Sequence, residues 1–315
     1  MLRFNCVHFT AHPVLSAPSI LAPPKVRCVS MRIAVVGCVH GNLSVAYAAV
    51  ARVSPAPDLV IMCGDIQACR TPHDLLSMSV PVKYRRMGDF HKYHSGERLA
   101  PVLTLIVGGN HEASGFMSQL ENGGWIAENM YYLGNCGLVK VGDLVVCGLS
   151  GVYYAPHAQL PRFEAAQFAN SYLETCDSDA KFSAYHVRAH DVEELEKLPS
   201  HLVDVMVTHD WPAGIERYGK LNRLLKQKPF FREDIKNHEL GNPLTFALLN
   251  ALKPQWWFAA HLHVKYTAKY KNTRFLALDK VMRGRHFLEV VDVEPRKRED
   301  AVLDGVVNLS PHSSV

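Results

Sequence analysis

The chain has 315 residues, of which 48% are hydrophobic and 20% are charged. This composition is typical of a globular protein, and no stretch approaches the roughly 18 uninterrupted apolar residues of a membrane span, so we expect no membrane partner. The formal net charge is +4, but three of the basic residues lie in residues 1–30, which contain no acid. The rest of the chain is almost neutral, which excludes nucleic-acid binding through bulk charge. Any nucleic-acid binding would have to come from a local patch of basic residues.

Residues 1–30 lack the pattern of a folded segment. Four prolines would interrupt a helix there, and no strand alternation is present. The basic, acid-free composition has some features of a transit peptide, while the alternative is an upstream extension to a domain that starts at Met31. We favour the extension and expect it to be disordered.

From Met31 onwards, hydrophobic runs alternate with helical stretches, which predicts an α/β fold. The main strands are expected at 32–37, 58–63, 101–107, 202–207 and 255–260, with shorter strands at 130–133, 137–141 and 144–149 and closing strands at 266–270, 273–277 and 286–293. Residues 153–184 have no clear periodicity, and a long irregular insert of this kind is usually functional or disordered. After residue 293 the chain becomes charged and then rich in serine, so we expect a C-terminal tail over 294–315.

Each of the five main strands is followed at once by a residue that can bind a metal ion. These residues are Cys38 and His40, Asp65, Asn110 and His111, His209, and His261 and His263. Ligands in open α/β sheets collect beyond the carboxyl ends of the strands. Seven donors and one further histidine are the number needed for two metal ions that share a carboxylate, a pair suited to phosphoester hydrolysis. Each fragment alone is also compatible with a structural role, but the ordered set indicates a metal centre.

The order of these motifs resembles the calcineurin-like metallophosphoesterases, whose pattern is D-x-H, GD, GNH[ED], H and GHxH. The matching segments here are Cys38-Val39-His40, Gly64-Asp65, Gly109-Asn110-His111-Glu112, His209 and Ala260-His261-Leu262-His263. Cysteine in place of the first Asp and alanine in place of the last Gly are typical of one branch, the RNA lariat debranching enzymes. The chain resembles that branch from Met31 to Val293, including Tyr185-His186-Val187-Arg188.

The resemblance implies a four-layer α/β/β/α sandwich with two mixed sheets over residues 31–293, with an RNA-recognition insert at 150–188. It also implies the ligands of two divalent metal ions. One ion would be held by Cys38, His40 and His263, the other by Asn110, His209 and His261, and Asp65 would bridge them. His111 would lie beside the leaving oxygen as a general acid or charge stabiliser. Contacts to RNA are expected from Tyr185, His186 and Arg188.

The activity implied is hydrolysis of the 2′–5′ phosphodiester at the branch point of excised intron lariats, with branched RNA as the partner and the nucleus as the location. A thiolate ligand favours Fe(II) or Zn(II), while Mn(II) could support activity in excess; alternatively, Cys38 is only structural. Relatives continue into a further C-terminal region, which we expect to be missing or reduced here. The rival interpretations are the same metal site acting on a phosphoprotein or nucleotide, and a non-catalytic scaffold.

Overall fold

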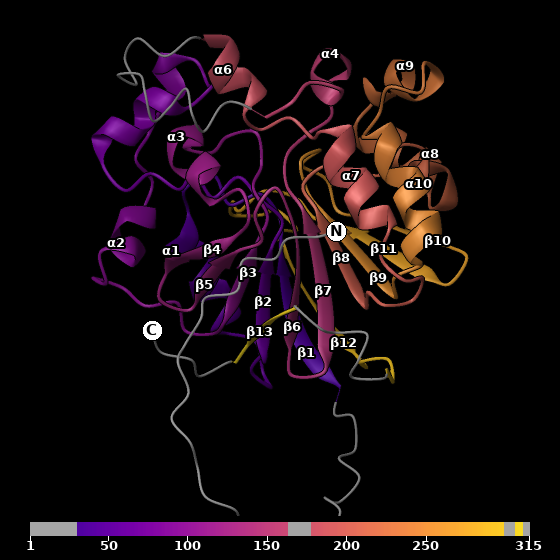
Figure 1. The fold of residues 1–315 in the computed structure, drawn as a ribbon, viewed down its shortest axis with the longest axis horizontal. Helices are drawn as coiled ribbons and strands as arrows, with labels where there is room; N and C mark the ends of the chain where they lie inside the picture. The colour runs from indigo at the N-terminus through magenta and orange to yellow at the C-terminus, as the bar shows by residue number, and fades with distance from the viewer. Residues whose placement is uncertain (1–29, 163–177, 299–305, 311–315) are drawn as a thin grey trace, which may run out of the picture.

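The computed structural model describes residues 30–162, 178–298 and 306–310, and its described strands form two sheets (Figure 1). The predicted N-terminal extension lies outside these residues except for Ser30. The first sheet has the order β12-β1-β2-β3-β5-β4 and the second β10-β11-β9-β8-β7-β6-β13. The strands of the first sheet are β1 (Met31–Val36), β2 (Leu59–Met62), β3 (Thr104–Ile106), β4 (Gly124–Ala127), β5 (Met130–Tyr132) and β12 (Leu288–Val293). Those of the second are β6 (Cys136–Val141), β7 (Leu144–Leu149), β8 (Val205–Thr208), β9 (Trp256–Ala259), β10 (Tyr266–Tyr270), β11 (Thr273–Ala277) and β13 (Val307–Leu309).

Both sheets are mixed. Strands β1, β2, β3 and β5 run parallel, with β12 and β4 antiparallel at the edges. In the second sheet β7, β8, β9 and β11 run parallel, whereas β6 pairs antiparallel with β7 and β10 pairs antiparallel with β11. The predicted pair of mixed sheets is therefore confirmed.

The burial of alternate side chains shows why the sheets stack as inner layers. In β1, Ile33 and Val35 belong to the core between the two sheets, whereas Ala34 and Val36 belong to the core under the helices. In β8, Val205 and Val207 face the inter-sheet core, while Met206 packs under the helices of the other side. A sheet that is buried on both faces must pack against another layer on each side. Here each sheet packs against the other sheet on one face and against helices on the other, which gives four layers.

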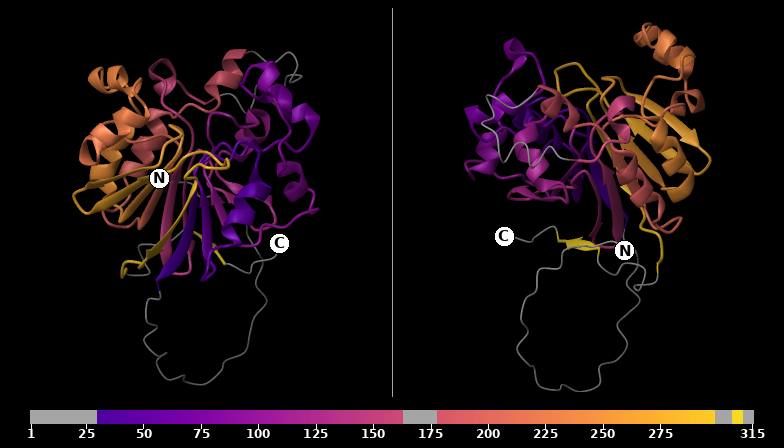
Figure 2. Two further views of the ribbon diagram at one scale, coloured as in Figure 1. Left: turned by 180° about the vertical axis from the view of Figure 1, so that it is seen from behind. Right: turned by 45° about the horizontal axis from the view of Figure 1, so that its top comes forward.

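Helices cover the outer face of each sheet (Figures 1 and 2). Helix α1 (Leu43–Val50) packs on the first sheet, and α7 (Ala189–Glu196) and α10 (Pro243–Leu252) pack on the second. The remaining described helices are short: α2 (Phe90–His94), α3 (Ser114–Met117), α4 (Ala155–Ala158), α6 (Ser178–Ser183), α8 (Leu221–Gln227) and α9 (Phe231–Lys236), with 3₁₀ turns at Pro72–Ser77, Val82–Tyr84, Ser118–Leu120 and Ile215–Tyr218. None of the helices in the described ranges combines the length and apolar character needed to cross a bilayer.

The predicted tail over 294–315 requires correction for the part that the structure describes. Strand β13 pairs in parallel with β6 and extends the second sheet. Before it, the backbone N–H of Arg296 donates to Asp204 Oδ1 at 3.0 Å, and Arg298 Nη2 forms an ion pair with the same oxygen at 2.5 Å. Asp204 is fully buried, and its other oxygen accepts the N–H of Val145 at 3.0 Å. A buried carboxylate thus holds the segment after β12 against the second sheet.

Replacing Asp204 with alanine should destabilise the fold strongly, because Arg298 and the Val145 N–H would be left without their buried partner. Breaking such a pair costs on the order of 3–5 kcal/mol in the free energy of unfolding. Chemical denaturation measures this change. The matched control is Glu233→Ala, which removes the exposed partner of Lys236 and should change stability by less than about 0.5 kcal/mol. Equal stability of the two variants would contradict the anchoring role of Asp204.

Candidate metal centre

Five parallel strands from the two sheets deliver the predicted site residues. Strands β1, β2 and β3 of the first sheet end before Cys38, Asp65 and Asn110, respectively. Strands β8 and β9 of the second sheet end before His209 and His261. The site is therefore assembled across the two sheets, at the carboxyl ends of strands that adjoin within each sheet.

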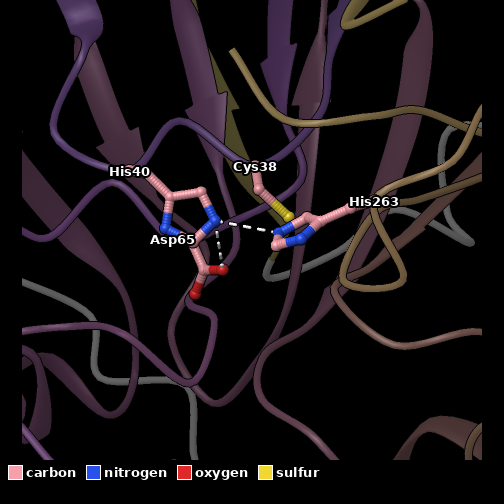
Figure 3. Close-up of side chains that lie close together, drawn as sticks. All are labelled: Cys38, His40, Asp65 and His263. Atoms are coloured by element: carbon pink, nitrogen blue, oxygen red, sulfur yellow. Dashed lines mark hydrogen bonds and ion pairs between the residues drawn. The ribbon is translucent and has the colours of Figure 1, made fainter. Parts of the chain in front are cut away.

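The first group of donors consists of Cys38, His40, Asp65 and His263, which point toward one another in Figure 3. Their ligand atoms all lie within 4.8 Å of one another. His40 Nε2 is 2.9 Å from His263 Nε2 and 3.6 Å from Asp65 Oδ2. The structure thus brings together the residues that the family resemblance assigns to one metal ion and to the bridge.

The second group surrounds His209. Its Nε2 lies 3.5 Å from Asp65 Oδ2 and 3.2 Å from Asn110 Oδ1, and its ring centroid is 5.0 Å from that of His261. The backbone N–H of His261 also donates to Cys38 Sγ at 3.1 Å, which ties the two groups together. Asp65 faces His40 on one side and His209 on the other, the position that a bridging carboxylate requires.

Hydrogen bonding around His209 tests whether this group fits a cation. His209 Nδ1 lies 2.6 Å from the carbonyl oxygen of Cys63, and because a carbonyl only accepts, Nδ1 must carry the proton. Nε2 then presents a lone pair to the Asp65 carboxylate and the Asn110 amide oxygen. Acceptors buried this close together repel one another unless a cation lies among them, and a backbone carbonyl that accepts from Nδ1 is the usual arrangement for a metal-binding histidine. The residues present fit divalent metal ions.

The protonation states fit the same role. Burial lowers the pKa of His209 to about 4 and that of His263 to about 3, so both rings are neutral at physiological pH. Burial alone would raise the pKa of Asp65, but the surrounding histidines, His209 first, hold it well below its usual range. Burial and the nearby Asp65 raise the pKa of the Cys38 thiol, so a cation bound there would have to displace its proton.

Glycines allow the loops to approach one another closely. A Cβ on Gly64, whose φ is +104°, would lie 2.4 Å from His209 Nδ1, and one on Gly109 would lie 2.2 Å from Asp65 Oδ1. Larger residues at either position would push apart the two loops that hold Asp65 and Asn110. The Gly residues of the GD and GNH[ED] motifs are thus required by the packing of the site.

Four of the seven donor residues have left-handed backbone conformations. The φ angles are +48° at His40, +55° at Asp65, +58° at His261 and +48° at His263. Such angles are unfavourable for residues with side chains and concentrate at functional sites. They turn each side chain away from its strand direction and into the shared centre.

His111 lies at the edge of the centre. Its ring packs edge to face against His40 at a centroid distance of 5.1 Å, and its backbone N–H donates to Asp65 Oδ1 at 3.0 Å. The ring is partly exposed, whereas Asp65 is 1% exposed. His111 is therefore next to the donors but remains accessible to a substrate.

Glu112 has a structural role that was not inferred from the sequence. Its Oε1 accepts the backbone N–H groups of Ile66 and Gly109, both at 3.0 Å, and so joins the loop of Asp65 to the loop of Asn110. The side chain is 3% exposed, and burial together with Asp65 raises its pKa to about 7. In the sequence, Glu112 is marked only as the fourth residue of the Gly109–Glu112 motif. That position does not show that its side chain contacts the loop of Asp65.

The three residues predicted to contact RNA differ in how deeply they are buried. Arg188 is 1% exposed and donates to the carbonyl oxygen of His186 at 2.9 Å and to Ser183 Oγ at 2.8 Å. His186 is 2% exposed, stacks on Tyr154 and lies 2.8 Å from His157 through the Nδ1 atoms. Direct RNA contact does not fit this burial; both residues instead organise the segment. Tyr185 is only partly buried, and part of the predicted insert, 163–177, lies outside the described residues.

Two family models match the chain. One, described as Calcineurin-like phosphoesterase, covers residues 31–265, and the other, described as Lariat debranching enzyme, C-terminal domain, covers 270–308. The second match reaches the first two residues of β13, within the predicted tail over 294–315. These two matches together cover almost all of the described strands.

Curated relatives resemble the same region. A protein of Arabidopsis thaliana named Lariat debranching enzyme is 42% identical over 274 residues, which are 84% of this chain and 63% of the relative. Proteins of the same name from Homo sapiens and Gallus gallus are 43% and 42% identical over 84% of this chain and 50% of their own lengths. The chain thus spans between half and two thirds of these relatives. By its family match and its assembled donors, the chain belongs to the calcineurin-like phosphoesterases.

Proposed function

We propose that this chain is a metal-dependent phosphodiesterase that hydrolyses the 2′–5′ bond of branched RNA. The observation that carries the proposal is the convergence of Cys38 with His40, Asp65 and His263, since a thiol in this position replaces the carboxylate of the wider family pattern. Relatives that are 42–43% identical are named Lariat debranching enzyme, which supports branched RNA as the substrate. Hydrolysis of excised intron lariats would make the nucleus its location and RNA processing its role.

The seven donors would hold two divalent cations. Cys38, His40 and His263 would bind one, Asn110, His209 and His261 the other, and Asp65 both. Such a pair supplies Lewis-acid stabilisation of the charge that develops on the phosphate during hydrolysis. The mixture of thiol, imidazole and carboxylate favours Fe(II) or Zn(II), with Mn(II) as a weaker substitute.

His111 is the residue placed to handle the leaving group. As the P–O2′ bond breaks and water adds to phosphorus, the 2′-oxygen needs a proton. The accessible ring of His111, fixed by its N–H bond to Asp65 and by contact with His40, can donate that proton. Tyr185, partly exposed on the neighbouring segment, would contact a base near the branch.

The direct test compares three substrates with the same metal-loaded protein. A synthetic 2′–5′ branched RNA should be cleaved at the branch much faster than linear 3′–5′ RNA or p-nitrophenyl phosphate. Metal content measured on the same sample should be close to two ions per chain. A preference for p-nitrophenyl phosphate would instead favour a phosphatase acting on a phosphoprotein or nucleotide, and an inactive protein with less than one ion would favour a scaffold.

Replacing His111 with alanine should preserve the bound metal and lower kcat for the branched RNA by about 10²–10⁴-fold, the usual effect of removing a general acid. The matched control is His190→Ala, which removes a histidine whose side chain is 76% exposed on α7. The control should retain the parent rate. If the His111 variant also retained it, another group would have to protonate the leaving oxygen.

Replacing Cys38 with aspartate should shift metal preference from Zn(II) toward Mn(II), because a carboxylate is a harder ligand than a thiolate. Competition binding followed by metal analysis measures the ratio. Cys63→Ala is the control, since Cys63 is equally buried but lies outside the group of donors. An unchanged ratio in the Cys38 variant would make that cysteine purely structural.

A further inference from the structure

A basic groove adjoins the candidate metal centre on the side of α8. Its volume is about 520 Å³, and His263 forms part of its wall. The cationic side chains that line it come from α8 and its ends, from the residue before β10 and from the loop before β12; they are Lys220, Arg223, Lys228, Lys265 and Arg285. A groove that shares His263 with the donor group leads directly to the proposed reaction site.

The groove carries an excess of positive charge. Lys265 pairs with Glu289 at 2.7 Å, and Arg285 pairs with Asp279 at 3.3 Å. Among the described residues, no carboxylate lies within ion-pair distance of Lys220, Arg223 or Lys228. Cations without a carboxylate at ion-pair distance are suited to bind an anionic ligand.

The surroundings of Lys228 support this interpretation. Burial lowers its pKa, Asp279 opposes that shift, and Arg285 and Lys280 add to it. Phe230 lies beside it, with Lys228 Nζ 5.6 Å from the ring centroid, and is 66% exposed. An exposed ring next to a lysine is typical of surfaces that bind single-stranded nucleic acid by stacking and phosphate contacts.

The groove lies apart from the segment that carries Tyr185. Helix α6, just before Tyr185, and helices α8 and α9 stand on opposite sides of the same end of the molecule (Figures 1 and 2). A branched RNA has three strands that leave the branch in different directions. The segment around Tyr185 can contact RNA strands on its own side of the molecule. It cannot contact an RNA strand that leaves the branch toward α8.

We propose that this groove binds the phosphate backbone of one single-stranded arm of the branched RNA, an inference that rests on the proposed function. A lone phosphate would fill little of the groove, whereas an RNA strand would present a phosphate to each of the cations in turn. The branch phosphate would lie at the donor group near His263, and the arm would continue past Lys265 toward Arg223 and Lys220.

The experiment compares a branched RNA that has long arms with one trimmed to a single nucleotide per arm. The parent protein should show a lower KM for the long-armed RNA and a similar kcat for both. Lys220→Ala/Arg223→Ala should raise the KM for the long-armed RNA roughly tenfold, because two phosphates would no longer be neutralised, and should leave kcat and the trimmed RNA unaffected. Both residues are exposed, so folding should be preserved.

The matched control is Lys226→Ala/Arg232→Ala, which removes two exposed cations from α8 and α9 that do not line the groove. It changes the net charge equally and should behave as the parent. Equal effects of the two double variants on KM would overturn the groove assignment, as would a parent KM that does not depend on arm length.

Binding without cleavage separates this inference from the proposed function. Fluorescence anisotropy of a labelled linear RNA should show that the groove variant alone binds more weakly, and that its salt dependence falls by about 0.7 in log–log slope for each phosphate that is no longer neutralised. If the parent cleaves neither branched RNA, the proposed function fails. Weaker RNA binding by the groove variant would still support the groove as an RNA-binding surface. Unchanged binding by that variant would overturn the groove assignment.

Discussion

The structure of the centre depends on one buried carboxylate, Asp65, which faces histidines from both sheets. His40 follows a strand of the first sheet and His209 a strand of the second, and their Nε2 atoms lie 3.6 and 3.5 Å from the same oxygen of Asp65. Because His209 uses its only proton on the Cys63 carbonyl, the acceptors gathered around Asp65 have few donors among them. A pair of divalent cations would offset this concentration of acceptors, which is why the metal centre and the junction of the sheets coincide.

The sandwich architecture allows the candidate metal centre to lie where the two sheets adjoin. Parallel strands in each sheet end at the same side, and strands buried on both faces fix the sheets against each other. Small residues then permit close approach of the loops, with Gly64 against His209 and Gly109 against Asp65. Glu112 adds a direct link between two of these loops. The left-handed conformations at His40 and Asp65 persist because these contacts over-determine the loop paths.

Much of this arrangement could be predicted from local patterns. Hydrophobic runs that end in Gly, Asp, Asn or His identify strand ends, and the parallel α/β order places such ends together, so a group of donors around Asp65 follows from local patterns. The pair of mixed sheets follows only from the resemblance to the calcineurin-like metallophosphoesterases. The features that local patterns do not predict depend on contacts between distant segments. The burial of Arg188 depends on how its segment folds back, and the anchoring of Arg296 and Arg298 depends on Asp204 nearly a hundred residues earlier. The periodicity of a single segment does not show which distant residue it will contact. The groove beside His263 escapes prediction for the same reason, since Lys220 and Arg285 become neighbours only in the fold.

The measurement that tests the central claim most directly is anomalous X-ray diffraction from crystals of the metal-loaded protein, recorded at the absorption edges of iron, zinc and manganese. Two anomalous peaks roughly 3.5–4 Å apart, one on each side of the Asp65 carboxylate and one of them next to Cys38 Sγ, are the expected result. A single peak, or peaks that lie away from Asp65, would contradict a two-cation centre assembled across the sheets.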